Sequence, residues 1–170
     1  MTLETSTKQH LRAAIGNNAA ANEVITALNT IDGVTSVAAE ITARTDGQPA
    51  TATFSPAAGG SNVSEVTITV KDGNGVAVTT PVIIDVLLSD AATGLGLTAT
   101  TASGAVAAKS ASGTDLSTLV SKKALKVQTL ANGTYVLSIT DTAKTGFYVV
   151  ANIPGQKPSV SSQLVSGNYG

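Results

Sequence analysis

Few side chains in this sequence could carry chemistry, and they are spread thinly along the chain. The only histidine, His10, stands beside Gln9. A Ser-His-Asp triad needs an orienting carboxylate and a nucleophile beside its histidine, and neither residue type surrounds His10 in a recognisable pattern. No G-x-S-x-G elbow occurs either. We therefore expect His10 to be a surface or interface residue, and the sequence predicts no catalytic residue.

Four aspartates are the next candidates for acid–base chemistry. Asp85, Asp90, Asp115 and Asp141 could in principle pair as a general acid and base. They fall in separate predicted elements, however, and lack the aromatic neighbours of a sugar-binding site. Solvated loop acids are the favoured interpretation. Asp85 differs from the others because it interrupts an apolar strand, so we expect it to pair with a lysine such as Lys126.

Two short patterns resemble ligand-binding motifs without completing them. The run Asp72-Gly73-Asn74-Gly75 lacks the further acids, including a late glutamate, that a calcium loop requires. It is no dinucleotide fingerprint, because Val78 occupies the place of the third glycine. The run therefore predicts a hairpin turn. We expect no metal site and no cofactor.

Charge and composition exclude several classes of function. The 170 residues carry 10 basic and 11 acidic side chains, so the net charge is −1. A nucleic-acid binder needs a basic footprint, and the basic cluster Lys122, Lys123 and Lys126 is too small, so it predicts a solvated strand edge. There is no cysteine, and hence no disulfide framework or thiolate site. Ala, Thr, Ser and Gly make up about half of the chain, a composition that suits interface packing better than catalysis.

Neither a membrane nor a small-molecule substrate is an expected partner. The apolar runs are far shorter than the roughly 20 residues that a membrane helix requires. Aromatic residues make up only 3% of the chain and tryptophan is absent, so a stacking platform for a sugar is not expected. The opening MTLETSTKQHL lacks the apolar core of a signal peptide, which predicts synthesis in a host cytoplasm.

The first 32 residues predict a short helical N-terminal arm. Thr5 or Ser6 can cap a helix start, and Gly16 ends the first segment. The apolar positions follow helical spacing, which gives each of the two helices one narrow stripe. These positions are Leu11, Ala14 and Ile15 in the first helix, and Ala21, Val24, Ile25 and Leu28 in the second. Because such short helices are marginal alone, they must pack on the rest of the chain or on a partner.

Residues 33–62 predict an extended connector, and residues 63–170 predict a β-sandwich. The connector is rich in Gly, Pro, Ala and Thr, so we expect residues 44–61 to form a loop or arm. Beyond it, apolar residues alternate with polar ones, and turn signals separate the runs. Expected strands lie at about 63–71, 81–89, 124–129, 134–140, 147–153 and 160–166, with a further short strand near 95–102 in an otherwise loop-like region at 89–123. The fold class is therefore mainly β, an antiparallel sandwich preceded by a short helical arm.

The strand at 81–89 identifies two further candidate binding residues. It is apolar on both faces, which favours a central position in its sheet. If the face of Val82 and Val86 lies in the core, Ile83 and Leu87 point outward, and exposed apolar positions often mark an interface. With the arm residues Leu11, Ile15, Val24 and Leu28, these two are the predicted partner-binding residues.

Several segments carry a resemblance to known families. The segments VTITVKD (66–72), NG (74–75) and PV (81–82) resemble the opening strand and turn of bacterial Ig-like repeats, and NGTYVL (132–137) and TGFYVVA (145–151) are similar to their later strands. The whole-chain pattern, including segments 5–29, 86–104 and 122–155, resembles small virion structural proteins of tailed bacteriophages. That resemblance implies a head decoration or cement protein on the capsid exterior. It implies the major capsid protein as partner and self-association, expected to give a homotrimer.

Other functions stay open at this point. A tail or neck structural module would share the fold and differ only in its partner. An Ig-like adhesion or carbohydrate-binding module is disfavoured by the lack of an export signal and by the scarcity of aromatic residues. An enzyme would require a site that the sequence does not contain.

Overall fold

A computed structural model describes residues 24, 27 and 45–170. The chain divides into two compact units, Met1–Arg44 and Thr45–Gly170, and the second contains every strand described below. Most of the predicted arm, with Leu11, Ile15 and Leu28, lies outside the described residues. Val24 and Ala27 are described, and both are helical and exposed.

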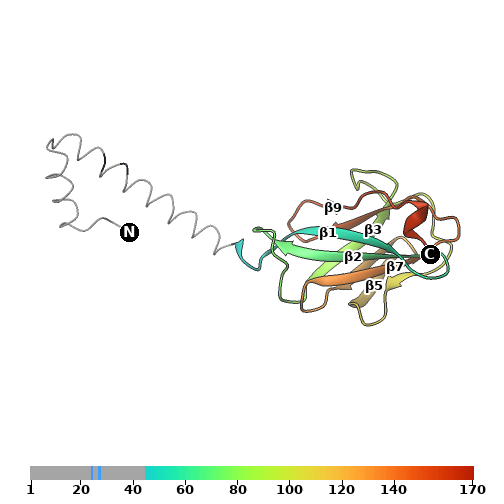
Figure 1. Cartoon of the computed structure of the whole chain (residues 1–170), viewed down its shortest axis with the longest axis horizontal. Coiled ribbons are helices and arrows are strands. Elements are labelled where there is room, and N and C mark those ends of the chain that lie inside the picture. The colour runs from blue at the N-terminus through green and yellow to red at the C-terminus, as the bar shows by residue number, and fades with distance from the viewer. Residues whose placement is uncertain (1–23, 25–26, 28–44) are drawn as a thin grey trace. The chain divides into compact units, whose positions relative to one another are not determined.

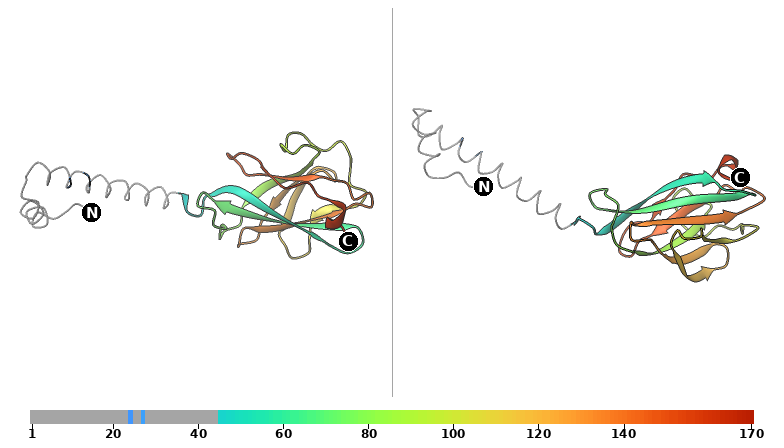
Figure 2. Two further views of the ribbon diagram at one scale, coloured as in Figure 1. Left: turned by 45° about the horizontal axis from the view of Figure 1, so that its top comes forward. Right: turned by 60° about the horizontal axis from the view of Figure 1, so that its bottom comes forward.

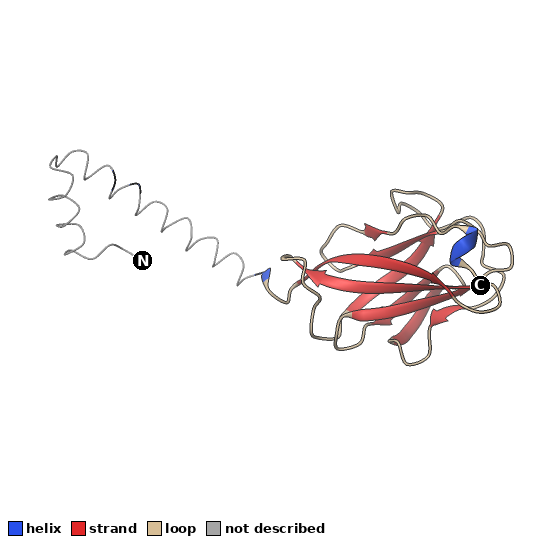
Figure 3. Cartoon of the chain, viewed as in Figure 1, coloured by secondary structure: helices blue, strands red, loops and turns tan. Residues whose placement is uncertain are grey.

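The second unit consists of two antiparallel sheets packed as a β-sandwich (Figures 1 and 3). The four-stranded sheet has the order β1-β2-β7-β4. Its strands are β1 (Pro49–Ala58), β2 (Val63–Asp72), β7 (Thr134–Thr140) and β4 (Val106–Ala108). The five-stranded sheet has the order β5-β6-β3-β8-β9. Its strands are β5 (Thr114–Val120), β6 (Ala124–Gln128), β3 (Ile83–Ser89), β8 (Tyr148–Asn152) and β9 (Ser159–Val160), and a 3-10 turn η1 (Ser166–Asn168) follows.

The core lies between the two sheets and is built by simple alternation. Every second residue of β2 is buried, and β7 contributes three fully buried side chains from the same sheet. The opposite sheet supplies the matching layer from its three inner strands, β6, β3 and β8. The fully or almost fully buried core side chains include Val66, Ile68, Val70, Ile84, Val86, Leu88, Tyr135, Leu137, Ile139 and Val149. Burial of each large side chain contributes about 1.5–3 kcal/mol relative to exposure, so these strands hold the sheets together.

The strands with regular alternation confirm the sequence predictions. β2, β6, β7 and β8 lie where the pattern placed them, and β3 is central, with β6 on one side and β8 on the other. The Asp72–Gly75 run forms the predicted turn. The Asp72 carboxylate accepts hydrogen bonds from the backbone N–H groups of Asn74 and Val76, both at 2.9 Å.

The prediction of a loop at residues 44–61 is wrong for most of this range, because residues 49–58 form strand β1. This strand pairs antiparallel with β2, with Phe54 opposite Ile68. Its inward positions are Ala52 and the partly buried Phe54, so small residues weaken the alternation that would have identified it. Two prolines in the strand also favoured a loop, but an edge strand tolerates proline. The sandwich therefore includes part of the predicted connector.

The region predicted as loop at 89–123 also needs correction. It contains β4 and β5, and the strand expected near 95–102 is absent. The final strand is shorter than predicted, since β9 has two residues and the chain continues into η1. Short or irregular strands of this kind give too few alternating positions for a periodic signal.

The described unit begins and ends at opposite ends of the sandwich (Figures 1 and 2). At one end, the Gly47 N–H donates to the Asp72 carboxylate at 3.0 Å. At the other, the carbonyl of Gly170 accepts from the Asn62 N–H, and the Gly170 N–H donates to the Val63 carbonyl. The ten residues of β2 separate these two points, which corresponds to about 30 Å of strand.

Candidate interaction surface

Of the two predicted binding residues in β3, one is exposed and the other is half-buried. Ile83 retains 46% of the accessible surface of the residue, and Leu87 has intermediate burial. Val82 and Val86 are buried, as expected. The prediction that this strand turns Ile83 and Leu87 outward is confirmed, whereas their role in binding a partner stays a prediction.

The outer face of the five-stranded sheet is divided by a charged pair. Asp85 stands opposite Lys126 of β6, and the Lys126 Nζ lies 2.8 Å from the Asp85 Oδ1. This confirms the pairing that the strand pattern predicted. Both side chains keep more than a third of their exposure, so the pair contributes little to stability, as exposed ion pairs generally do.

Leu87 belongs to a row of apolar residues that is already partly covered. It stands opposite Ala124 of β6 and Val150 of β8, and both of these are buried. The loop after β3 lies close above this row, since a Cβ built on Gly94 would lie 2.6 Å from the Val160 Cγ2 and 3.1 Å from the Val150 Cγ2. Ile83 is therefore the better exposed residue of the predicted pair.

The most exposed apolar segment of a strand is one that the sequence did not identify. All seven residues of β5 are exposed, although strands in a sandwich ordinarily bury one face. Leu116, Leu119 and Val120 retain 43%, 48% and 39% of their exposure. The pairing of β5 with β6 shifts register between Asp115 and Ser117 and again between Thr118 and Val120. The two leucines are the extra residues at these bulges, which explains why TDLSTLV shows no alternation.

The lysines that follow β5 do not form the solvated edge that the sequence predicted. The Lys122 Nζ donates to the Ser103 carbonyl at 3.0 Å. The Lys123 Nζ donates to the carbonyls of Thr98 and Ala99 at 2.8 and 2.9 Å. Both lysines therefore bind backbone carbonyls of the loop that connects β3 and β4, and these bonds hold that loop in place.

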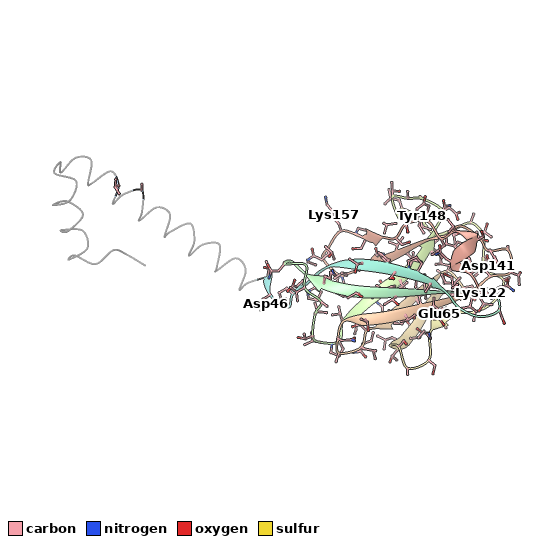
Figure 4. The ribbon with its side chains drawn as sticks, in the orientation of Figure 1. Asp46, Glu65, Lys122, Asp141, Tyr148 and Lys157 are labelled. Carbon is pink, nitrogen blue, oxygen red and sulfur yellow. The ribbon has the colours of Figure 1, made fainter. Side chains whose placement is uncertain are left out.

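Asp141 is a buried loop anchor rather than the solvated acid that the sequence predicted. Its carboxylate accepts hydrogen bonds from the Ser103 N–H at 3.1 Å and the Thr145 N–H at 2.8 Å. Burial raises the pKa of Asp141, but the hydrogen bonds from Thr145 and Ser103 outweigh burial and hold the pKa below its ordinary value. Figure 4 shows Asp141 and Lys122 near the same end of the sandwich, and both hold Ser103.

Asp90 and Asp115 are exposed, but their carboxylates also accept hydrogen bonds from other segments of the chain. Asp90 accepts from the Thr98 hydroxyl at 2.6 Å and from the Ala99 N–H at 2.7 Å, and the bond from Thr98 lowers its pKa most. Asp115 accepts from the Tyr135 hydroxyl at 2.6 Å and from the Ala108 N–H at 2.9 Å. None of the four aspartates considered for acid–base catalysis is paired with another in the described contacts.

Within residues 45–170, together with 24 and 27, no group of three His, Asp or Glu side chains is placed to hold a metal ion. A helix long and apolar enough to cross a membrane is not found in the same residues. Chemically, what the described surface offers is a set of exposed apolar side chains on one strand, Leu116, Leu119 and Val120 of β5. Such a surface is suited to binding another polypeptide.

Comparisons with known proteins add no assignment. No protein-family model matches the chain, and no curated protein matches it significantly.

Proposed function

We propose that this chain is a non-enzymatic structural protein of a tailed-bacteriophage virion. It decorates the outside of the assembled head, binds the major capsid protein and stabilises the capsid lattice. On this proposal the sandwich is of the Ig-like class. The observation that carries the proposal is the set of exposed apolar side chains on β5, which would serve the expected self-association into a homotrimer, on a domain whose candidate catalytic aspartates are all engaged in hydrogen bonds or ion pairs.

The arrangement of the sandwich supports this role. The chain enters at the end that carries the Asp72 turn, and its last residues are bonded at the other end. In the proposed mode of action, the arm at residues 1–32 binds the capsid protein and the sandwich extends from it. A protein that binds only the assembled lattice stabilises that lattice by mass action, and many copies reinforce one another through multivalency.

Co-sedimentation of the full chain with undecorated heads, and separately with tails, of the phage that encodes it tests the proposal. We expect saturable binding to heads and a raised melting temperature of the heads. Binding to tails alone would transfer the role to a tail or neck module, and binding to neither would contradict a virion role.

A truncation tests whether the arm or the sandwich binds the head. The chain reduced to residues 45–170 should lose head binding, because it lacks the arm. If this fragment still binds heads as tightly as the full chain, the sandwich and not the arm provides the contact with the capsid protein.

A further inference from the structure

The sequence contains two Asn-Gly dipeptides, Asn74-Gly75 and Asn132-Gly133, and the fold places them in different surroundings. The glycine after an asparagine has no Cβ, so its backbone nitrogen can approach the asparagine side chain closely. When that nitrogen attacks the side-chain Cγ, the side-chain amide is lost and a cyclic imide, a succinimide, forms. An Asn-Gly dipeptide is therefore open to spontaneous modification wherever the backbone around it can move.

Asn74-Gly75 lies in the turn that follows β2, at the end of the sandwich where Figure 4 labels Asp46. Both residues of the dipeptide are exposed. Gly75 has a φ of +79°, and the position that a Cβ would occupy there has no other atom within 4 Å. The Gly75 N–H donates to the Asp72 carbonyl at 3.1 Å, which is near the long end of the ordinary range. Movement of the Gly75 nitrogen towards Asn74 therefore meets little resistance from packing.

Asn132-Gly133 lies in a turn that the core holds in place. Gly133 is buried, and the Val78 side chain and the Val70 carbonyl crowd it. The Gly133 carbonyl accepts from the Val70 N–H at 2.9 Å. The Asn132 Oδ1 accepts from the N–H and the hydroxyl of Thr134, at 3.2 and 2.7 Å. Closure of a ring here would break bonds that fix this turn to β2.

We propose that Asn74 is a site of spontaneous deamidation in the folded protein, whereas the fold protects Asn132. In the reaction, the Gly75 nitrogen loses its proton and bonds to the Asn74 Cγ. The bond from that Cγ to the side-chain nitrogen breaks, and ammonia leaves. Water then opens the succinimide at either of its carbonyls, which gives aspartate or isoaspartate at position 74. Each product replaces a neutral amide with a carboxylate.

The new carboxylate would form in a turn that another carboxylate organises. Asp72 is 2% exposed, and its side chain accepts from the N–H groups of Asn74 and Val76. The same carboxylate accepts from the Gly47 N–H, and the Asn74 Oδ1 accepts from the Thr45 hydroxyl at 3.1 Å. A like charge beside a carboxylate is unfavourable, and isoaspartate also lengthens the main chain of the turn. Deamidation should therefore loosen the bonds that hold the start of the sandwich.

Ageing of the full chain in a mildly alkaline buffer, followed by peptide mapping with mass spectrometry, tests the site. We expect Asn74 to convert about tenfold faster than Asn132, because closure at Asn132 must also break a hydrogen bond to β2. The control is the same chain unfolded in guanidinium chloride, where the two dipeptides should convert at similar rates. Equal rates in the folded chain, or the same preference for Asn74 in the unfolded chain, would overturn the inference.

The consequence for the turn is tested on the aged protein itself. Deamidated chains gain a negative charge, so anion exchange separates them, and peptide mapping identifies the fraction altered at position 74. We expect this fraction to melt at a lower temperature than unmodified chains, as measured by circular dichroism. If it melts like the unmodified chains, the turn is not loosened.

Two matched variants complete the test. In Asn74→Gln the longer side chain closes a ring far more slowly, so this variant should keep its melting temperature on ageing. Asn132→Gln should lose stability on ageing as the wild type does. The opposite pattern, in which only Asn132→Gln is spared, would place the labile site at Asn132 and contradict the inference. The inference concerns the turn at Asp72 and is independent of head binding.

Discussion

At the scale of single residues, several polar side chains of the sandwich form hydrogen bonds that connect separate segments of the chain. Tyr135 shows the pattern, because its ring lies fully in the core while its hydroxyl reaches Asp115 on β5. Burial raises the pKa of Tyr135 above its ordinary value of 10.0, and the bond to Asp115 adds to that effect. The hydroxyl therefore stays protonated and keeps donating across the neutral range.

Three aspartates are expected to make the folded state less stable at acid pH. The pKa of each carboxyl of Asp72, Asp90 and Asp141 lies below its ordinary value of 3.8. The folded form therefore holds these protons less tightly than the unfolded form does. The stability that they contribute is fully present above pH 3.8 and is lost as pH falls through the lower folded values. We expect the melting temperature, measured by circular dichroism, to be level from neutral pH to about pH 5 and to fall below about pH 4.

Asp141→Asn is the matched variant for this prediction. It should lower the melting temperature at neutral pH, because the buried carboxylate loses its charge-assisted bonds to Ser103 and Thr145. The gap to the wild type should narrow as the pH falls below 3.8 towards the lowered pKa of Asp141, because the wild-type carboxyl then also becomes protonated. A gap that stays constant with pH would show that Asp141 does not contribute to the acid response.

At the scale of elements, two glycines in similar turns are expected to differ in how they tolerate a side chain. Gly133 has a φ of +75°, and a Cβ there would lie 2.8 Å from the Val78 Cγ2 and 2.9 Å from the Val78 carbonyl oxygen. Gly155 has a φ of +78° but open space around it. Gly155→Ala should cost about 1–2 kcal/mol from backbone strain alone. Gly133→Ala should cost clearly more, since the β2–β3 connection must also move.

Urea unfolding of both variants measures this difference in the free energy of unfolding. Equal losses would show that the segment at Val78 yields to the added methyl group at no cost. The comparison is informative because each glycine is the second residue of a turn signal, NG for Gly133 and PG for Gly155, and the sequence alone does not distinguish the two sites.

The strands differ in whether the sequence alone could predict them. β2, β3, β7 and β8 carry large residues at every second position, so the period identified them and also predicted the Asp85–Lys126 pair. β1 was missed because Ala52 is small and Phe54 stands alone, and β4 because it has three residues. β5 was missed because two bulges remove its alternation. The strand whose seven residues are all exposed therefore gives no periodic signal.

At the scale of the whole molecule, the division into two units predicts independent folding of the sandwich. Residues 45–170 hold both sheets and the whole of the described core. We expect the 45–170 fragment to unfold in one cooperative transition with a melting temperature within a few degrees of the full chain. Calorimetry of the two proteins checks this, and a fragment that fails to melt cooperatively would mean that residues 1–44 complete the fold.

The positions of Gly47 and Gly170 at opposite ends of β2 have a mechanical consequence. A pull on the sandwich through Gly47 and Gly170 acts along the strands, because these residues lie at opposite ends of β2. Hydrogen bonds between antiparallel strands run perpendicular to the strands. The β1–β2 ladder would therefore be loaded in shear, with its bonds sharing the force, and would not peel open one bond at a time. A sandwich loaded in this way resists tension best along the direction of its strands.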